Sequence, residues 1–362
     1  MTGTTSPTLG VNHLGLNGIE FVEFASPDPT RLHALFLEFG FSRVMQHASL
    51  PIDLYAQHDI VFLLNRDPNS FAGRFAATHG PSIASMGWRV FDAKKALDTA
   101  TGRGARAAES PDLSREGAKL EAIYGIGDSL IYLVDGDPLR SVAERYAPLG
   151  FVALESPDRV ADRGFLVIDH MTNNVFKGTM AMWSDFYKNV FGFTEVRYFD
   201  IRGAKTGLTS FALRSPCGKF CIPINEADEK KSQINEYLDE YKGPGIQHLA
   251  FATRDILASL DSFKGSDAVS FLDIEEDYYR SVFERVPNVK EDKARIEAHN
   301  VLVDGDESGY LLQIFTKNII GPIFIELIQR EAHMGFGDGN FGALFRAIER
   351  DQMRRGVFDD KH

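Results

Sequence analysis

Cysteine, tryptophan and long apolar runs are scarce in this sequence. Only two cysteines, Cys217 and Cys221, and two tryptophans occur among the 362 residues. So few thiols argue against a secreted protein held by disulfides and favour a reducing cytosol, which predicts a cytoplasmic protein. No stretch approaches the ~18 consecutive apolar residues of a membrane-spanning helix. The polar residues 1–8 predict no signal peptide.

Positive charge is also in short supply. The 39 lysines and arginines are outnumbered by 51 aspartates and glutamates, so the formal net charge is −12. This excess of negative charge disfavours binding to nucleic acid or to an anionic membrane, and we expect neither partner. The 44% hydrophobic and 25% charged residues are typical of a globular protein, and the length predicts two domains.

Two common hydrolase motifs are missing. The zinc-peptidase motif H-E-x-x-H and the serine-hydrolase motif G-x-S-x-G do not occur. The Gly-x-Gly strings near residues 335–339 follow no Rossmann-type strand and start no βαβ unit, so nucleotide binding is disfavoured. Cys217 and Cys221 lie in a strand-like run, which favours structural cysteines over metal ligands.

The chain carries a weak internal repeat. Both halves read strand, helix, Gly-Phe, strand, with Phe39-Gly-Phe41 in the first and Phe191-Gly-Phe193 in the second. We therefore expect two modules, over residues 1–150 and 151–362, with a linker between about Pro138 and Arg163.

A later pair of matching segments aligns the polar residues of the two modules. His79-Gly-Pro-Ser-Ile-Ala-Ser85 parallels Lys242-Gly-Pro-Gly-Ile-Gln-His248. On this register Ser85 takes the place of His248, and Glu23 takes the place of His170. The strand-like run 130–135 shows no counterpart of Glu326. We therefore expect the first module to be structural and to hold no metal.

Three polar residues of the second half stand out because each lies in an apolar, strand-like run. His170, His248 and Glu326 are separated by equal intervals of 78 residues (248 − 170 and 326 − 248). Burying such groups is costly unless they are paired. Two imidazoles and one carboxylate form the ligand pattern of non-haem Fe(II) oxygenases. Zinc is a competing ion for the same ligands, and hydrogen-bonded core histidines are the metal-free alternative.

Alternation along the strands tests whether these side chains can face one another. In a strand, every second residue points to the same face. If the strands line one curved sheet, the inward-facing side chains are His170, His248, Gln313, Phe315, Phe324 and Glu326. This set would combine a metal site with an amide and two aromatic rings.

The end of the chain combines a glycine-rich segment with an amphipathic pattern. Phe336 and Asn340 lie in the glycine-rich segment, and Phe341, Leu344, Phe345 and Ile348 follow at helical spacing. Asn340 is a candidate N-cap. We expect a terminal helix that packs on the core and serves as a lid over the site.

With these motifs in place, the chain resembles the 4-hydroxyphenylpyruvate dioxygenase family over nearly its full length. The segments that carry the resemblance are Ile-Asp-His170-Met-Thr-Asn-Asn, Ile-Pro-Ile-Asn225-Glu, Gly-Ile-Gln247-His248-Leu-Ala-Phe, Leu-Leu-Gln313-Ile-Phe315, Gly-Pro-Ile-Phe324-Ile-Glu326 and Gly-Phe336-Gly-Asp-Gly-Asn340-Phe341. The first half matches more loosely.

The resemblance implies an α+β fold. It implies two vicinal-oxygen-chelate modules, in which paired βαβββ units form open barrels, with a C-terminal helix as lid. It implies Fe(II) held by His170, His248 and Glu326. The implied enzyme converts a 2-oxo acid, 4-hydroxyphenylpyruvate, and O2 to homogentisate and CO2 in tyrosine catabolism. We also expect a homo-oligomer, either a dimer or a tetramer.

The resemblance also assigns residues around the metal. Hydrogen bonds to substrate and bound water would come from Ser210, Asn225, Gln233 and Gln313. The substrate ring would lie against Phe315, Phe324, Phe336, Phe341 and Asn340. Gln247 also belongs to the family pattern, although alternation points it away from the metal because it neighbours His248. Either the strand bulges there or Gln247 acts from behind that ligand.

Three alternatives stay open. The similar 4-hydroxymandelate synthase oxidises the benzylic carbon instead of the ring, and it tends to carry aliphatic residues where this chain has Asn225 and Phe341. A metal-free binding module is a candidate of another class, and a complete ligand set argues against it. Extradiol dioxygenases share the ligand types but lack Gln313 and the terminal helix pattern.

Overall fold

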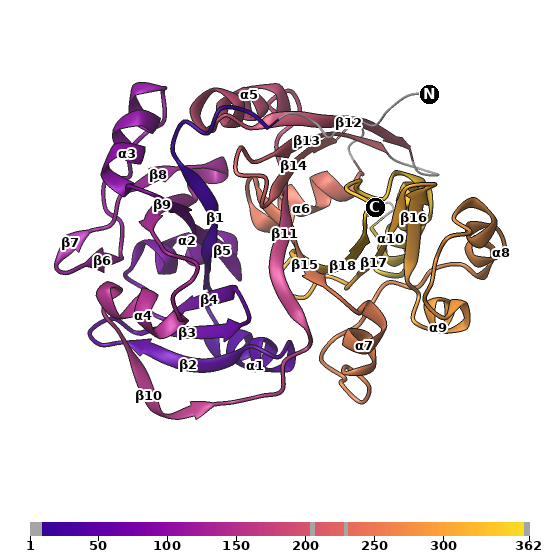
Figure 1. The fold of residues 1–362 in the computed structure, drawn as a ribbon, viewed down its shortest axis with the longest axis horizontal. Coiled ribbons are helices and arrows are strands. Elements are labelled where there is room, and N and C mark those ends of the chain that lie inside the picture. Colours follow the sequence, from indigo (N-terminus) through magenta and orange to yellow (C-terminus); the bar gives the residue numbers. More distant parts are fainter. Residues whose placement is uncertain (1–8, 203–206, 228–230, 358–362) are drawn as a thin grey trace.

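Two curved sheets of eight strands each form the framework of the molecule, and Figure 1 shows them side by side. The computed structural model describes residues 9–202, 207–227 and 231–357, so the segment 1–8, for which we expect no signal peptide, lies outside the described residues. Among the helices of these ranges, none combines the length and the apolar character needed to cross a membrane.

Each sheet mixes strands that are adjacent in the sequence with strands that are distant in it. In spatial order, the first sheet contains β10 (Phe151–Asp158), β2 (Ser42–His47), β3 (Ile52–Gln57), β4 (Ile60–Asn65), β1 (Leu16–Ala25), β5 (Ser82–Val90), β9 (Leu130–Asp135) and β8 (Ala122–Tyr124). In the same order, the second contains β12 (Thr194–Arg202), β13 (Gly207–Arg214), β14 (Cys221–Ala227), β11 (Phe165–Asn174), β15 (Gly245–Thr253), β18 (Phe324–Glu331), β17 (Gly309–Phe315) and β16 (Leu302–Asp306). A short separate ribbon is made by β6 (Ser114–Arg115) and β7 (Ala118–Lys119).

Helices connect the strands and cover the sheets. The α-helices of the described residues are α1 (Pro29–Glu38), α2 (Phe71–His79), α3 (Ala93–Gly102), α4 (Val142–Tyr146), α5 (Met180–Phe186), α6 (Gln233–Tyr241), α7 (Ile256–Asp261), α8 (Glu276–Arg285), α9 (Lys293–Ala298) and α10 (Phe341–Arg354). Several begin at the residue type that caps a helix. Asp28, Ser70 and Ser232 each accept a hydrogen bond from a backbone N–H in the first turn of the helix that follows.

The two modules repeat the same topology. β1, α1, β2, β3 and β4 form a βαβββ unit, and β11, α5, β12, β13 and β14 form another in the second sheet. In both modules the first strand pairs in parallel with the fourth, as β1 does with β4 and β11 with β14. The expected α+β fold with paired βαβββ units is therefore confirmed.

The strand pairings also show which residues of the two modules correspond. Thr172 lies opposite His248, and Glu23 lies opposite Ser85. Ser85 thus takes the place of His248, as expected. Glu23 therefore corresponds to Thr172. The prediction that Glu23 corresponds to His170 was wrong, because His170 lies two residues earlier on the same inward face of its strand. Alternation identifies the inward face of a strand but does not identify which inward residue meets its neighbour.

The same pairings give the other two ligand positions of the first module. Phe21 stands where His170 stands, and Tyr132 stands where Glu326 stands. As expected, the strand 130–135 offers no carboxylate at that point. With Ser85 at the third position, the first module presents a phenyl ring, a hydroxyl and a phenol. These groups do not make a 2-His-1-carboxylate set.

Two bulges recur at the same places in both sheets. In the second sheet the extra residues are Asp169 and Gln247, where the pairing of β11 with β15 shifts by one. In the first sheet they are Glu20 and Ala84, where the pairing of β1 with β5 shifts in the same way. A bulge inserts one residue and redirects its neighbours. The repeated bulges therefore belong to the shared framework, and they set which side chains point inward.

β10, which comes last in the sequence among the strands of the first sheet, lies beyond the boundary expected at residue 150. β10 pairs with β2, with Phe151 opposite His47. We therefore propose that the division between the modules follows Asp158.

Aromatic side chains join the two modules. Trp88 of the first module lies 4.9 Å from Phe191 and 5.3 Å from Phe220 of the second, measured between ring centroids. Phe41 contacts Phe251 at 5.8 Å. Such ring pairs contribute beyond the area they bury, by about 1 kcal/mol each. A continuous apolar core thus runs between the sheets and holds the second module against the first.

Glu23 is a carboxylic acid in the core of the first module. It is fully buried, and it accepts hydrogen bonds from Asn65 Nδ2 at 3.0 Å and from Ser85 Oγ at 2.5 Å. Burial raises the pKa of Glu23 to about 7, against the opposing effect of these hydrogen bonds.

We predict that Glu23→Gln removes a pH dependence of stability. The folded-state pKa lies above the unfolded value, so the stabilising contribution is complete below about pH 4.5 and is lost as the pH rises through about 7. The variant should gain up to about 3 kcal/mol over the parent at pH 8 and little at pH 5. Urea unfolding at both pH values measures this. The exposed Glu109→Gln is the control, and equal pH profiles for parent and Glu23→Gln would contradict the prediction.

Candidate metal centre and active site

Three neighbouring strands of the second sheet bring the predicted ligands together. His170 is on β11, His248 on β15 and Glu326 on β18. Ala250 lies opposite His170 on one side and beside Glu326 on the other. Its small, buried side chain leaves room between the imidazole and the carboxylate. The expected convergence of these three residues on one face is therefore observed.

The three ligand atoms point at one small volume. His170 Nε2 lies 3.0 Å from Glu326 Oε2, His248 Nε2 lies 3.3 Å from the same oxygen, and the two Nε2 atoms are 3.4 Å apart. Ligands at about 2.1 Å from one ion and at right angles to each other are about 3.0 Å apart. All three residues are buried, and among the described residues they are the one such group of potential ligands within mutual reach. The set fits a divalent metal.

The charges of the site support each other. Burial opposes the charged form of both groups, yet the Glu326 carboxylate raises the pKa of His170 to about 9, and His170 in turn lowers the pKa of Glu326 to about 2. Burial lowers the pKa of His248, which favours its neutral, metal-binding form. The ionised carboxylate of Glu326 is therefore stabilised mainly by the neighbouring His170.

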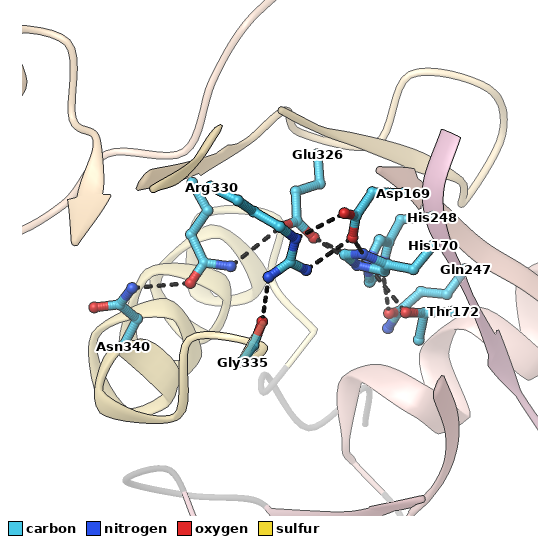
Figure 2. Close-up of polar contacts among 10 residues, drawn as sticks. Asp169, His170, Thr172, Gln247, His248, Glu326, Arg330, Gly335 and Asn340 are labelled. Atoms are coloured by element: carbon cyan, nitrogen blue, oxygen red, sulfur yellow. Dashed lines mark hydrogen bonds and ion pairs between the residues drawn. The ribbon is translucent and has the colours of Figure 1, made fainter. Parts of the chain in front are cut away.

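His170 is oriented by a carboxylate behind it. Asp169 Oδ2 accepts a hydrogen bond from His170 Nδ1 at 2.8 Å, which leaves Nε2 for the metal. Arg330 donates two hydrogen bonds to Asp169, at 2.7 and 2.8 Å, and one to the Gly335 carbonyl at 2.7 Å (Figure 2). Burial disfavours the Asp169 carboxylate, but Arg330 outweighs this effect and lowers the pKa of Asp169. Arg330 thus joins a metal ligand to the glycine-rich segment.

His248 is oriented by an amide. Gln247 Oε1 accepts a hydrogen bond from His248 Nδ1 at 3.0 Å, which leaves Nε2 for the site. Gln247 is the extra residue of a bulge and also lines the cavity. Both explanations offered for its position in the sequence therefore apply together: the strand bulges, and Gln247 contacts the ligand from behind.

Glu326 has an amide neighbour of its own. Gln313 Nε2 donates to Glu326 Oε1 at 3.1 Å, and Gln313 Oε1 accepts from Asn340 Nδ2 at 2.8 Å. Asn340 is fully buried and does not line the cavity. It occupies the predicted N-cap position of α10, but its side chain makes no capping hydrogen bond. The amide group of Asn340 hydrogen-bonds Gln313 instead.

The ligands open into an aromatic cavity. The residues that line it, besides the three ligands, are Thr172, Phe199, Ile201, Leu208, Ser210, Pro223, Asn225, Gln233, Gln247, Gln313, Phe315, Phe324, Phe336, Phe341, Leu344, Phe345 and Ile348. Phe324 stacks on His248 with centroids 4.8 Å apart, and Phe341 meets Phe199 edge-on at 4.9 Å. A mostly apolar wall with a few polar groups is typical of a small-molecule site.

The C-terminal helix closes one side of this cavity. Phe341, Leu344, Phe345 and Ile348 of α10 face inward at the expected helical spacing. One turn after Ile348, the buried Gln352 donates to Glu236 of α6 at 2.9 Å. Figure 1 places α10 against the second sheet, near the C-terminus.

All predicted site residues except Asn340 line this cavity. Asn340 is buried behind the cavity wall, where it contacts Gln313. Sequence reasoning missed Asp169, Thr172 and Arg330. Asp169 and Thr172 lie within two residues of His170, and Arg330 lies four residues after Glu326 on β18. Polar residues that flank a ligand in a strand are a signal that could have found them.

Comparisons with known proteins agree with this geometry. A model of the hydroxyphenylpyruvate dioxygenase N-terminal domain matches residues 11–138, and a model of the glyoxalase, bleomycin resistance protein and dioxygenase superfamily matches residues 167–314. Protein MelA of Shewanella colwelliana is 56% identical over 351 residues, which cover 96% of this chain and 98% of that protein.

Two further proteins show how the likeness extends. The 4-hydroxyphenylpyruvate dioxygenase of Pseudomonas sp. (strain P.J. 874) is 44% identical over 96% of this chain and 98% of that protein. A solved structure of a mutant 4-hydroxymandelate synthase from Streptomyces coelicolor superposes with a TM-score of 0.80, at 26% identity, over 93% of this chain and 99% of that one. The chain therefore belongs to the 4-hydroxyphenylpyruvate dioxygenase family and has the vicinal-oxygen-chelate fold.

Proposed function

We propose that the protein is an Fe(II)-dependent dioxygenase that converts 4-hydroxyphenylpyruvate and O2 to homogentisate and CO2 in tyrosine catabolism. The observation that carries the proposal is the buried set of His170, His248 and Glu326 at one end of an aromatic cavity. Three protein ligands leave open positions on the ion for a chelating 2-oxo acid and for O2. Bound Fe(II) would activate O2. Oxidative decarboxylation of the 2-oxo acid would take up one oxygen atom, and ring hydroxylation with migration of the side chain would take up the other.

The polar side chains of the cavity suit the far end of this substrate. Ser210 and Asn225 lie opposite each other on β13 and β14. Asn225 pairs with Asn174, four residues beyond His170, which corresponds to about 13 Å along the strand. Asn225 Nδ2 donates to Asn174 Oδ1 at 3.3 Å, so the side-chain oxygen Oδ1 of Asn225 is the atom that could accept from a substrate hydroxyl. We propose that Ser210 and Asn225 bind the phenol hydroxyl while the 2-oxo acid lies at the metal.

Aromatic side chains would hold the substrate ring between these two ends. Phe315, Phe324, Phe336 and Phe341 line the cavity, and offset ring contacts contribute on the order of 1 kcal/mol each. Gln233, at the start of α6, is half-buried at the wall and is proposed to donate a hydrogen bond to the substrate. Fixed contacts at both ends and along the ring would orient one ring carbon toward the metal.

The terminal helix has a proposed role in excluding water. The α10 side chains that line the cavity are apolar, and exposed side chains of α10 make ion pairs, such as Arg346 with Glu275 at 3.1 Å. A closed, dry cavity protects a reactive oxidant from water and from other side chains. We propose that α10 is the lid of the site.

A related reaction is a specific second candidate. The 4-hydroxymandelate synthase that superposes on this chain shows that the fold also serves a different oxidation, as that protein's name states. Phe341 and Asn225 favour ring hydroxylation here, since aliphatic residues are expected at these places in the synthase. A metal-free binding module is disfavoured by the buried ligand set.

Anaerobic reconstitution with Fe(II), followed by 4-hydroxyphenylpyruvate and O2, tests the reaction. We expect homogentisate and CO2 in equal amounts, measured by chromatography and gas analysis. 4-Hydroxymandelate as the main product would favour the second candidate. A reconstituted protein that consumes no O2 with this substrate would reject both.

We expect His170→Ala and Glu326→Ala to lose tight Fe(II) binding and turnover while the fold survives, because each removes one of three ligands. Metal content after gel filtration and the CO2 release rate measure the loss, and circular dichroism checks the fold. His58→Ala, at an exposed histidine, is the matched control. Normal metal content in either ligand variant would refute the assignment.

We expect Phe341→Ile to divert part of the product from homogentisate to 4-hydroxymandelate. Phe341 packs edge-on against Phe199, so its loss would widen the wall beside the ring. Chromatography of the products gives the ratio, with the exposed Phe91→Ile as control. An unchanged product ratio counts against the proposed role of Phe341.

A cytoplasmic location and a homo-oligomer, dimer or tetramer, stay predictions from the sequence. Light scattering of the purified protein checks the oligomeric state.

A further inference from the structure

A chain of hydrogen bonds runs from the surface of the second module to a metal ligand. Asn340 Oδ1 accepts from Tyr278 Oη at 2.6 Å and from Arg285 Nη2 at 3.3 Å. Asn340 Nδ2 donates to Gln313 Oε1 at 2.8 Å, and Gln313 Nε2 donates to Glu326 Oε1 at 3.1 Å. Asn340, Gln313 and Glu326 are all buried, at 0%, 3% and 2% exposure. We call these five residues the amide relay.

The groups at the two ends fix the direction of every bond between them. The guanidinium of Arg285 can only donate, and an ionised carboxylate such as that of Glu326 can only accept. Tyr278 Oη can donate to the Val303 carbonyl at 2.9 Å as well as to Asn340 at 2.6 Å. Arg285 Nη2, which can only donate, also contacts the same atom of Asn340, so that atom must be the amide oxygen. Asn340 must therefore present its oxygen to Tyr278 and its NH2 group to Gln313. Gln313 must in turn present its NH2 group to Glu326.

Two glycines allow the glycine-rich segment to lie this close. A Cβ at Gly337 would be 1.8 Å from Gln313 Oε1, and a Cβ at Gly339 would be 1.9 Å from Arg285 Nη1. Gly337 also has a φ of +81°, a conformation that other residues rarely adopt. The glycines therefore let the backbone pack directly on the amide relay, with Asn340 at its centre.

We infer that Asn340 and Gln313 are positioning residues: Asn340, held by Tyr278 and Arg285, orients the amide of Gln313 so that its NH2 group holds the Glu326 carboxylate for the metal. The inference rests on the proposed metal site but not on the identity of the product. Partners behind metal ligands set ligand orientation, and their loss typically weakens metal binding about 10–100-fold. Because Asn340 directly precedes α10, the same residue links the lid helix to the metal ligand.

The test is Asn340→Asp, which replaces the donor toward Gln313 with an acceptor. A carboxylate there would turn the Gln313 amide over, and Gln313 Oε1 would then face Glu326 Oε1, acceptor against acceptor. Co(II) is the probe, because its visible spectrum reports ligand geometry without turnover. We expect Co(II) to bind Asn340→Asp about 10–100-fold more weakly than the parent, with shifted visible bands.

The controls separate positioning from a structural role. Asn288→Asp adds the same charge at an exposed position of the same module and should match the parent in affinity and spectrum. Tyr278→Phe removes one of the two donors to Asn340, so it should give a smaller shift than Asn340→Asp. If Asn340→Asp does not fold, Tyr278→Phe decides the question. Lower thermal stability with the parent's Co(II) spectrum is the result of a merely structural role.

Two negative outcomes have different meanings. A parent protein that binds neither Co(II) nor Fe(II) would overturn the proposed metal centre. A parent that binds Co(II), with Asn340→Asp and Tyr278→Phe matching its affinity and spectrum, would overturn the amide relay alone.

Discussion

The burial of the Glu326 carboxylate between two imidazoles is the constraint on which the rest of the site depends. A lone ionised carboxylate in the interior would cost several kcal/mol. The imidazoles of His170 and His248 lie 3.0 and 3.3 Å from it, and a divalent ion would add the compensating charge. Around this centre, each ligand has a polar partner behind it, and the outer wall is apolar.

The two modules share a backbone bulge but use the residue inserted there in different ways. Asp169 and Glu20 occupy the same bulge. In the second module Asp169 pairs with Arg330 and orients a metal ligand. In the first, Glu20 forms buried ion pairs with Arg89 and Arg145. The same backbone feature therefore serves packing in one module and ligand orientation in the other.

The glycine-rich segment connects the metal ligands to the terminal helix at two points. Arg330 binds the carbonyl of Gly335, and the amide of Asn340 reaches Gln313. Between these points the inward ring of Phe336 lies 5.6 Å from the ring of His170. The segment thus touches partners of both His170 and Glu326, so the position of α10 and the geometry of the ligands are physically coupled.

Much of this could be predicted from local patterns in the sequence. Buried polar residues in apolar strands indicated His170, His248 and Glu326, and helical spacing indicated which side of α10 faces inward. The repeat indicated two modules of one topology. Recognition of the family motifs supplied Ser210, Asn225 and Gln233, which composition and periodicity would not have separated from ordinary strand-end and helix-start residues.

What the sequence determined by itself was the set of residue types and the faces on which they lie, because alternation and helical period are local properties of the chain. Only the tertiary structure decided the register between neighbouring strands. In that register Glu23 corresponds to Thr172, and a bulge directs Gln247 toward the cavity. The tertiary structure also decided that the Asn340 side chain hydrogen-bonds Gln313 and not the first turn of α10. These outcomes depend on bulges and on partners that are distant in sequence, and such contacts exist only after the sheet has closed.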